Sequence, residues 1–237
     1  PPPPHLFFFQ QKPAYEMLRG LVGSEMCIRD RADSGRYIMT NQGNFAPRPV
    51  TLEGKTVRLE PLSLKHASGL LAIGAEESIW QYLSTPAPTS MDKAREWIEE
   101  RLANQAAGER LPVAVISLAD GHFAGSTGYS SISRQHRTLE IASWYGLNYQ
   151  RTGINTECKY LLLKHAFEDL GALRVGLNVD MENARSRRAV ERIGGVQEGI
   201  LRKHRIRRDG TRRDTVIFGF INDDWPQVKE KLEELMN

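Results

Sequence analysis

Cysteine is scarce in this chain of 237 residues, and its two copies, Cys27 and Cys158, lie far apart in the sequence. Two isolated cysteines do not make a disulfide framework, and neither has the paired spacing of a zinc site. We therefore expect no bound metal and a reducing, cytoplasmic compartment. Cys158 lies in a segment with helical spacing, where a small buried residue is the simplest interpretation.

Long apolar runs and a strong charge of one sign are also missing. No run approaches the roughly 20 residues that a helix needs to cross a bilayer, so we expect a soluble protein that does not use a membrane. The formal net charge is only +3, so any basic surface must be local. An apolar share of 40% is enough for one core, which suits a single domain with a tail.

The first 49 residues do not resemble the rest of the chain. Pro1–Pro4 is a proline run and Leu6–Phe9 is a short apolar patch, an order that does not fit a signal peptide. Ala14–Arg31 resembles a sequence that recurs as read-through of sequencing-adapter DNA. Thr40–Pro49 contains two prolines and a glycine, as linkers do. We therefore interpret residues 1–49 as a non-native or disordered extension and linker.

From about Val50 the sequence carries regular strand and helix patterns. The expected strands are Thr56–Glu60, Pro112–Leu118, Phe123–Ile132, Thr138–Leu147, Leu173–Asp180, Val196–Ile206 and Thr215–Ile221. The expected helices are two that Ser63 and Ser90 cap, then Asn155–Leu170, Ala184–Ile193 and a short one from Asp224 to the end. This order predicts an α/β (α+β) fold with a mixed sheet. The expected sheet has about seven strands flanked by helices. It forms a single domain over residues 50–225, and a C-terminal helix follows at 226–237.

A strand ends and a helix begins around Gln150–Asn155, which reads QRTGIN. The first amides of a helix have no partner inside it, and the helix dipole adds positive charge at the same end. Gly153 lets the backbone curl and lets a phosphate approach, while Arg151 adds a formal charge. Neither a P-loop nor a G-x-G-x-x-G pattern is present, so the residues alone leave a structural turn and an anion site both open.

The segment Gln150–Asn155 resembles the Q/R-x-x-G-x-G/A signature of the GNAT superfamily of acetyltransferases. The wider string QRTGINTECKYLLLKHAF is similar to the RimJ/RimL-type branch, which acetylates protein N-termini and related amines. The resemblance covers about Thr51 to Trp225. It implies acetyl-CoA as the co-substrate, held by the side chains or backbone of Gln150, Arg151, Thr152, Gly153, Ile154, Asn155 and Thr156. Asn155 departs from the usual Gly or Ala, but asparagine is a good helix cap.

A second turn, at Asn183–Ser186, joins the next strand to the next helix. Asn183 stands at a natural N-cap position, and Gly194 ends the same helix. From the residues alone, Asn183 either caps the backbone or also binds a ligand. The resemblance implies that Asn183 contacts the pantetheine arm and that Ser186 is the proton donor to the leaving thiolate. Many relatives use a tyrosine where this chain has Val190, so Ser186 is the better candidate here.

The resemblance implies direct transfer of acetyl to an amine without a covalent enzyme intermediate. The amine must lose a proton, the thioester oxyanion needs donors, and the thiolate needs a proton. A backbone N–H in Ser143–Leu147 is the oxyanion donor that the family implies. Glu140 and His204 are the candidate bases, and a chain of waters is a third possibility. Arg205 stands where the RimL-like pattern carries glutamate.

Seven lysines and arginines lie in the hairpin segment Arg202–Arg213. We favour a solvated hairpin, then a surface for an acidic substrate or the CoA 3′-phosphate, and then RNA. Two further classes of protein remain open, a CoA-binding module without catalysis and a ribosome- or RNA-associated module. The acceptor is either a protein N-terminus or a small-molecule amine, nucleic acid is not the expected partner, and a monomer or a homodimer is expected.

Overall fold

The computed structural model describes residues 45–237. The segment Ala14–Arg31 therefore lies outside the described residues. Phe45, inside the expected linker, is 6% exposed and packs in the main core. No helix among the described residues is long and apolar enough to cross a membrane.

One eight-stranded sheet organises the fold, in the order β1-β2-β3-β4-β5-β6-β8-β7. Its strands are β1 (Leu52–Glu53), β2 (Val57–Pro61), β3 (Arg110–Ser117), β4 (Phe123–Ser133), β5 (Thr138–Tyr145), β6 (Arg174–Asp180), β7 (Val196–Ile206) and β8 (Arg212–Ile221). All neighbours are antiparallel except β5 and β6, which run parallel. The mixed sheet is confirmed. It has one more strand than expected, because β1, with only two residues, is too short to leave a strand pattern in the sequence.

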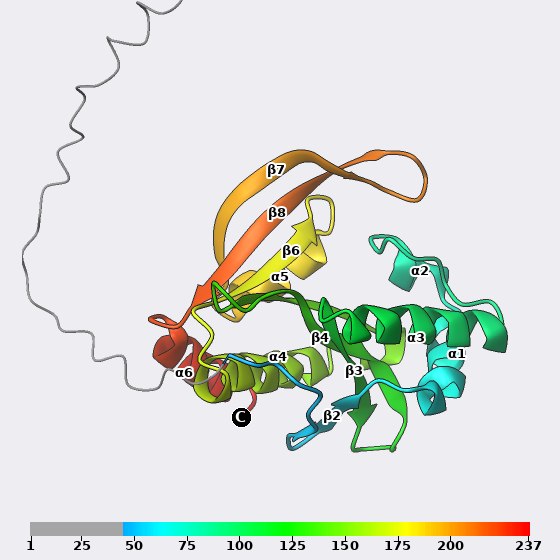
Figure 1. Ribbon diagram of the computed structural model, residues 1–237, viewed down its shortest axis with the longest axis horizontal. Helices are drawn as coiled ribbons and strands as arrows, with labels where there is room; N and C mark the ends of the chain where they lie inside the picture. The colour runs from blue at the N-terminus through cyan, green and yellow to red at the C-terminus, as the bar shows by residue number, and fades with distance from the viewer. Residues whose placement is uncertain (1–44) are drawn as a thin grey trace, which may run out of the picture. The chain divides into compact units, whose positions relative to one another are not determined.

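The helices lie on both faces of the sheet, as Figure 1 shows. They are α1 (Ala67–Gly74), α2 (Glu77–Trp80), α3 (Met91–Ala106), α4 (Ile154–Lys164), α5 (Ala184–Arg192) and α6 (Trp225–Leu235). Short helical turns occur at Leu64–His66, Leu147–Tyr149 and His165–Asp169. Ser90 caps α3 as expected, since its hydroxyl accepts a hydrogen bond from the Lys93 amide at 3.2 Å.

Two cores form because side chains on β5 alternate between the faces of the sheet. Leu139 and Ile141 belong to the larger core, with Cys158 of α4 and side chains of α6, and α4 and α6 lie side by side in Figure 1. Trp144 belongs to the second core, under α1 and α3, where its ring centroid lies 4.9 Å from that of Trp80. Cys158 is fully buried, as predicted.

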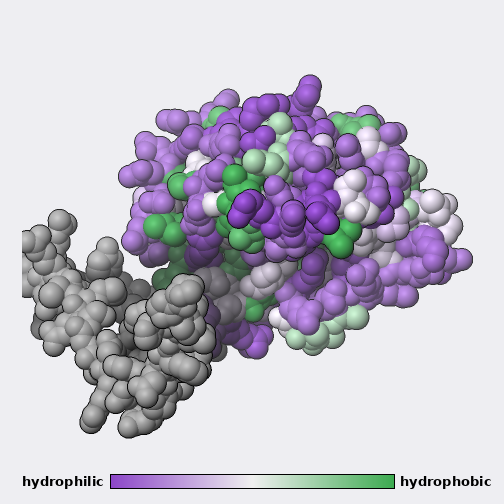
Figure 2. Space-filling view, turned by 90° about the horizontal axis from the view of Figure 1, so that it is seen from above, coloured by the Kyte–Doolittle hydropathy of each residue, from purple (hydrophilic) through white to green (hydrophobic). Residues whose placement is uncertain are grey.

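The β7–β8 hairpin is long and arches away from the other strands at the top of Figure 1. β7 is an edge strand, and nearly all of its residues are exposed. Its pairing with β8 shifts register between Gln197 and Gly199 and again between Leu201 and Arg205, and Lys203 has a φ of 52°. Figure 2, seen from above this hairpin, shows a mainly hydrophilic face with scattered hydrophobic residues.

Candidate active site

A fork in the sheet marks the candidate site. β5 and β6 pair only where Thr138–Glu140 lie against Arg174–Gly176. Beyond this point β5 continues to Tyr145 beside β4, and β6 continues to Asp180 beside β8. The facing edges of the two strands therefore carry backbone groups without a partner strand, and such groups need hydrogen bonds from elsewhere. An elongated ligand with amide groups can supply them.

The turn after β5 has the backbone that an anion site requires. Gly153 has φ 87° and Arg151 has φ 66°, both in the left-handed region, and α4 begins at Ile154. Glycine adopts this conformation without steric cost, which explains Gly153 at the helix start. The first amides of α4 lie at the positive end of the helix dipole, so the turn favours a phosphate group.

Gln150 joins the two sides of the fork instead of pointing freely outward. Its Nε2 donates to the Tyr145 carbonyl at 2.9 Å, and its Oε1 accepts from Arg185 Nη1 at 2.6 Å. Thr152 Oγ1 donates to the Tyr149 carbonyl at 2.8 Å. The side chains of Gln150 and Thr152 thus shape the turn, and their contribution to an anion site comes through the backbone.

Side chains in the first turn of α4 also contact other parts of the protein. Ile154 is 6% exposed and its side chain packs in the main core. Thr156 is buried, and its hydroxyl accepts from Arg192 Nη2 at 2.8 Å, which ties α4 to α5. Asn155 Oδ1 accepts from Lys159 Nζ at 3.4 Å. These three predicted cofactor-binding side chains therefore have partners within the protein, as those of Gln150 and Thr152 do.

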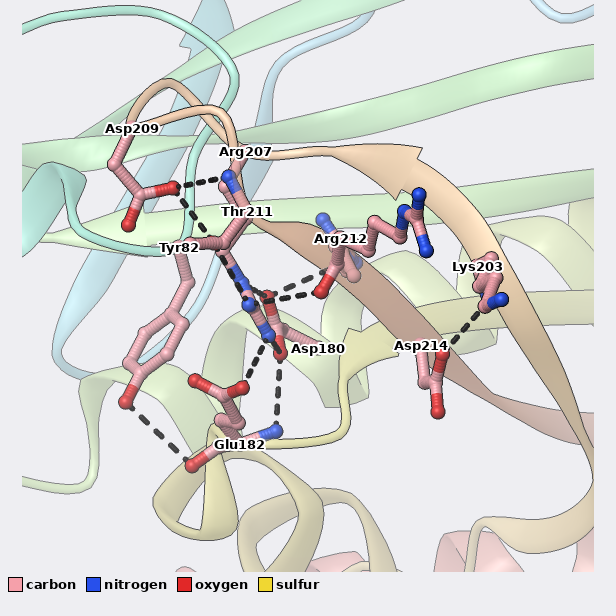
Figure 3. Close-up of polar contacts among 10 residues, drawn as sticks. Tyr82, Asp180, Glu182, Lys203, Arg207, Asp209, Thr211, Arg212 and Asp214 are labelled. Atoms are coloured by element: carbon pink, nitrogen blue, oxygen red, sulfur yellow. Dashed lines mark hydrogen bonds and ion pairs between the residues drawn. The ribbon is translucent and has the colours of Figure 1, made fainter.

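The second turn has the predicted cap. Asn183 Oδ1 accepts from the Ser186 amide at 3.0 Å at the start of α5. Ser186 is half-buried. Tyr82, which follows α2, donates to the Glu182 carbonyl at 3.5 Å, so this turn also contacts the helical side of the fold (Figure 3). Asn183 and Ser186 thus lie beyond the end of β6, just as Gln150–Asn155 lies beyond the end of β5.

A buried carboxylate supports this second turn. Arg207 of the hairpin donates to both oxygens of Asp180, at 2.8 Å from Nε and 2.9 Å from Nη2 (Figure 3). The Glu182 amide donates to the same carboxylate at 3.0 Å. Burial raises the pKa of Asp180, but the hydrogen bonds from Arg207 and Glu182 outweigh it, so the pKa falls below its usual value.

The candidate bases differ sharply in their surroundings. Glu140 is half-buried on β5 at the point where the fork opens, opposite Gly176 of β6. A Cβ at Gly176 would come within 3.2 Å of Glu140 Cγ, so the glycine makes room for this side chain. His204 is exposed on the free edge strand β7. The fork therefore favours Glu140 over His204 for contact with a bound thioester.

Several basic side chains of the hairpin segment Arg202–Arg213 lie close to carboxylates of the same protein. Arg207 pairs with Asp180 and Glu182, Arg208 pairs with Glu77 of α2 at 2.7 Å, and Arg213 Nε lies 3.6 Å from Asp180 Oδ2. These pairs leave less free charge for nucleic acid than the sequence indicates, which supports the interpretation of a solvated hairpin.

Sequence reasoning missed several residues that build the site. Arg185 and Arg192 connect α5 to the turn of α4, and Arg207 holds Asp180. Such long-range pairs leave no trace in local spacing. Lys159 did leave a signal, because a lysine interrupts the apolar stripe that Cys158, Leu162 and Leu163 form on α4.

Comparison with known proteins agrees with this geometry. Residues 56–196 match the family described as "Acetyltransferase (GNAT) domain". The chain is 30% identical over 112 residues to "Putative ribosomal N-acetyltransferase YdaF" of Bacillus subtilis, a match that covers 47% of this chain and 61% of that protein. The chain thus spans about three-fifths of the length of this relative.

Solved structures share the fold. A GCN5-related N-acetyltransferase from Brucella melitensis has a TM-score of 0.76 and 30% identity, covering 81% of this chain and 87% of that chain. Mycobacterium smegmatis RimJ in complex with CoA-disulfide has a TM-score of 0.66, covering 75% of this chain and 88% of that one. Its 21% identity shows a common fold alone.

Proposed function

Because this chain belongs to the GNAT acetyltransferase family, we propose that it transfers an acetyl group from acetyl-CoA to a primary amine. The amine attacks the thioester directly while both substrates are bound. The fork between β5 and β6 carries the proposal, since each parted strand leads into a turn that opens a helix. The relative YdaF supports the RimJ/RimL-type branch of the family.

The acetyl donor binds along the fork. Its diphosphate occupies the turn Gln150–Thr156, where the first amides of α4 and the charge of Arg151 favour an anion. Its pantetheine arm runs between β5 and β6 toward Glu140, with amide groups that match the unpaired strand edges. Asn183 borders this arm from the start of α5.

Three groups then serve the reaction. Glu140 removes a proton from the amine, directly or through one water, so that nitrogen has a lone pair for attack. A backbone N–H within Ser143–Leu147, at the end of β5 or just after it, stabilises the oxyanion. Ser186 donates a hydrogen bond or a proton to the leaving thiolate, for which its hydroxyl is chemically suited.

The acceptor is either a protein N-terminus or a small-molecule amine. The name of the relative YdaF refers to the ribosome. We therefore place N-terminal peptides of ribosomal proteins first in an acceptor panel, followed by polyamines and other small amines.

The decisive experiment measures thiol release from acetyl-CoA across this panel, together with acetyl-CoA binding. We expect binding and acceleration by at least one amine. If acetyl-CoA binds but no acceptor accelerates thiol release, the protein is a CoA-binding module without catalysis. If acetyl-CoA does not bind, both the enzyme and the CoA-binding module are rejected. Ser186→Ala and Glu140→Gln then test the mechanism, because neither side chain has a role in the fold that would abolish donor binding.

A further inference from the structure

Lys159 is a buried ammonium group in the second turn of α4. Its side chain lies between α4 and β5 and the residue is only 4% exposed. Lys159 Nζ donates to Ser143 Oγ of β5 at 2.6 Å and to Asn155 Oδ1 at 3.4 Å. It thus joins the strand along which the thioester runs to the first turn of the helix that receives the diphosphate.

Within residues 45–237, no carboxylate lies within ion-pair distance of Lys159. Glu157, two residues away, is engaged elsewhere: its carboxylate accepts from the amides of Lys55 and Thr56, at 2.5 Å and 2.9 Å. Buried charges are normally paired or neutralised, because removal from water is costly. Burial accordingly lowers the pKa of Lys159 to about 8.

The other titratable groups that face Lys159 are Cys158 of the same helix and Tyr145 of β5, whose ring centroid lies 6.0 Å from Nζ. Burial raises the pKa of Cys158 to about 12 and that of Tyr145 well above its usual value, so both are neutral. β4 contributes Thr127, which is hydrogen-bonded to Ser143 at 2.6 Å and does not titrate. The described surroundings therefore supply no anion.

We infer that Lys159 is the fixed counter-charge for the diphosphate of the acetyl donor, acting from beneath the turn at the start of α4. This inference rests on the proposed function. Lys159 lies one helical turn from Asn155, or about 5–6 Å along the axis, and a low-dielectric interior separates the two charges. The hydrogen bonds to Asn155 and Ser143 hold the ammonium in this place, so it is a positioning residue rather than a contact residue.

A specific proton linkage follows from this arrangement. A bound anion stabilises the charged form of Lys159 and raises its pKa above 8, so donor binding takes up protons between about pH 8 and 9. The affinity for acetyl-CoA should therefore fall as the pH rises through this range. A lysine with a purely structural role would show no such linkage.

Titration calorimetry at pH 8.5, in two buffers of different ionisation enthalpy, measures this uptake. We expect a fraction of a proton per acetyl-CoA with the unaltered protein and none with Lys159→Met. Lys159→Met should also bind acetyl-CoA about 10- to 100-fold more weakly at pH 7. Lys164→Met, which removes a lysine from the last turn of the same helix, should bind and take up protons normally.

Three outcomes overturn the inference: binding without proton uptake, equal uptake by Lys159→Met, or uptake lost when 3′-dephospho-acetyl-CoA replaces acetyl-CoA. The last would assign the charge to the 3′-phosphate. The dephospho comparison uses the unaltered protein, so the test survives if Lys159→Met does not fold. Absence of any acetyl-CoA binding would count against the proposed function instead.

Discussion

Glu140 carries the proposed proton transfer, and its replacement gives a sharp prediction at the scale of one residue. Glu140→Gln keeps the shape of the side chain at the fork but cannot accept the proton of an ammonium. We expect kcat to fall by about 10²-fold or more. Steady-state kinetics measures this fall.

The affinity for acetyl-CoA should not change in Glu140→Gln, which serves as the internal control. A kcat equal to that of the unaltered protein would contradict the role of Glu140 and would direct attention to a chain of waters.

Asp180 gives a second prediction at this scale. Asp180→Asn leaves Arg207 without its buried anion, so we expect the free energy of unfolding at pH 7 to fall by about 2 kcal/mol. The pKa of Asp180 is lowered in the folded protein, so its contribution is fully present above the usual value of 3.8 and is lost as the pH falls through the folded value. The difference in the free energy of unfolding between the unaltered protein and Asp180→Asn should therefore shrink as the pH falls below 3.8.

Urea unfolding of both proteins at several pH values between 3 and 7 measures this difference in the free energy of unfolding. Asp223→Asn replaces an exposed carboxylate and should leave the stability within about 0.5 kcal/mol. A difference that persists unchanged at pH 3 would show that the carboxylate of Asp180 does not contribute through its charge.

At the scale of elements, the turn before α4 depends on one backbone conformation. Gly153→Ala places a Cβ on a residue with φ 87°, which costs about 1–2 kcal/mol. The turn relieves this strain by moving the amides that face the diphosphate. We therefore expect acetyl-CoA to bind about 10-fold more weakly, which equilibrium binding measures.

Gly171→Ala is the matched control for this change. Gly171 has φ 66°, and a Cβ there meets no atom within 4 Å, as at Gly153. It should lower stability by a similar amount and leave acetyl-CoA binding unchanged. Equal weakening in both variants would show that strain alone, and not the position of the amides, governs affinity.

The long elements of this fold were predictable because their periods are local. Alternation placed β5 within two residues of its true bounds, and helical spacing placed the start of α4 within one residue. Short elements were not: β1 has two residues and α2 has four. The turn after β1 is held by Glu157, about a hundred residues later, and no local pattern reveals such a contact. The expected helix to Leu170 instead ends in a π-helical turn, His165–Asp169.

The candidate site was predictable to the same extent. The turns at Gly153 and Asn183 follow from glycine and cap chemistry, and both have the expected backbone. The pairing of Gln150 with Arg185 depends on how the segments that follow β5 and β6 meet, so no local pattern predicts it.

At the scale of the whole molecule, Phe45 shows that the main core includes a residue from the segment that composition assigns to a linker. Its side chain is 6% exposed and belongs to the main core, five residues before the boundary that composition indicates. Phe45→Ala should lower the free energy of unfolding by about 3 kcal/mol. Val50→Ala, at a residue that is 37% exposed, is the control and should have little effect. Equal stability of the two variants would show that the side chain of Phe45 does not contribute to the stability of the core.

The free edge of β7 has a consequence for the behaviour of this protein at high concentration. An exposed edge strand is a template on which a second chain can add, and this leads to aggregation. β7 interrupts that template with two register shifts, the left-handed residue Lys203 and a row of basic side chains. Because bulges twist an edge and like charges repel, copies of this chain should not join edge to edge through β7. The irregular strand should thus keep concentrated solutions of this protein free of aggregates that grow through β7.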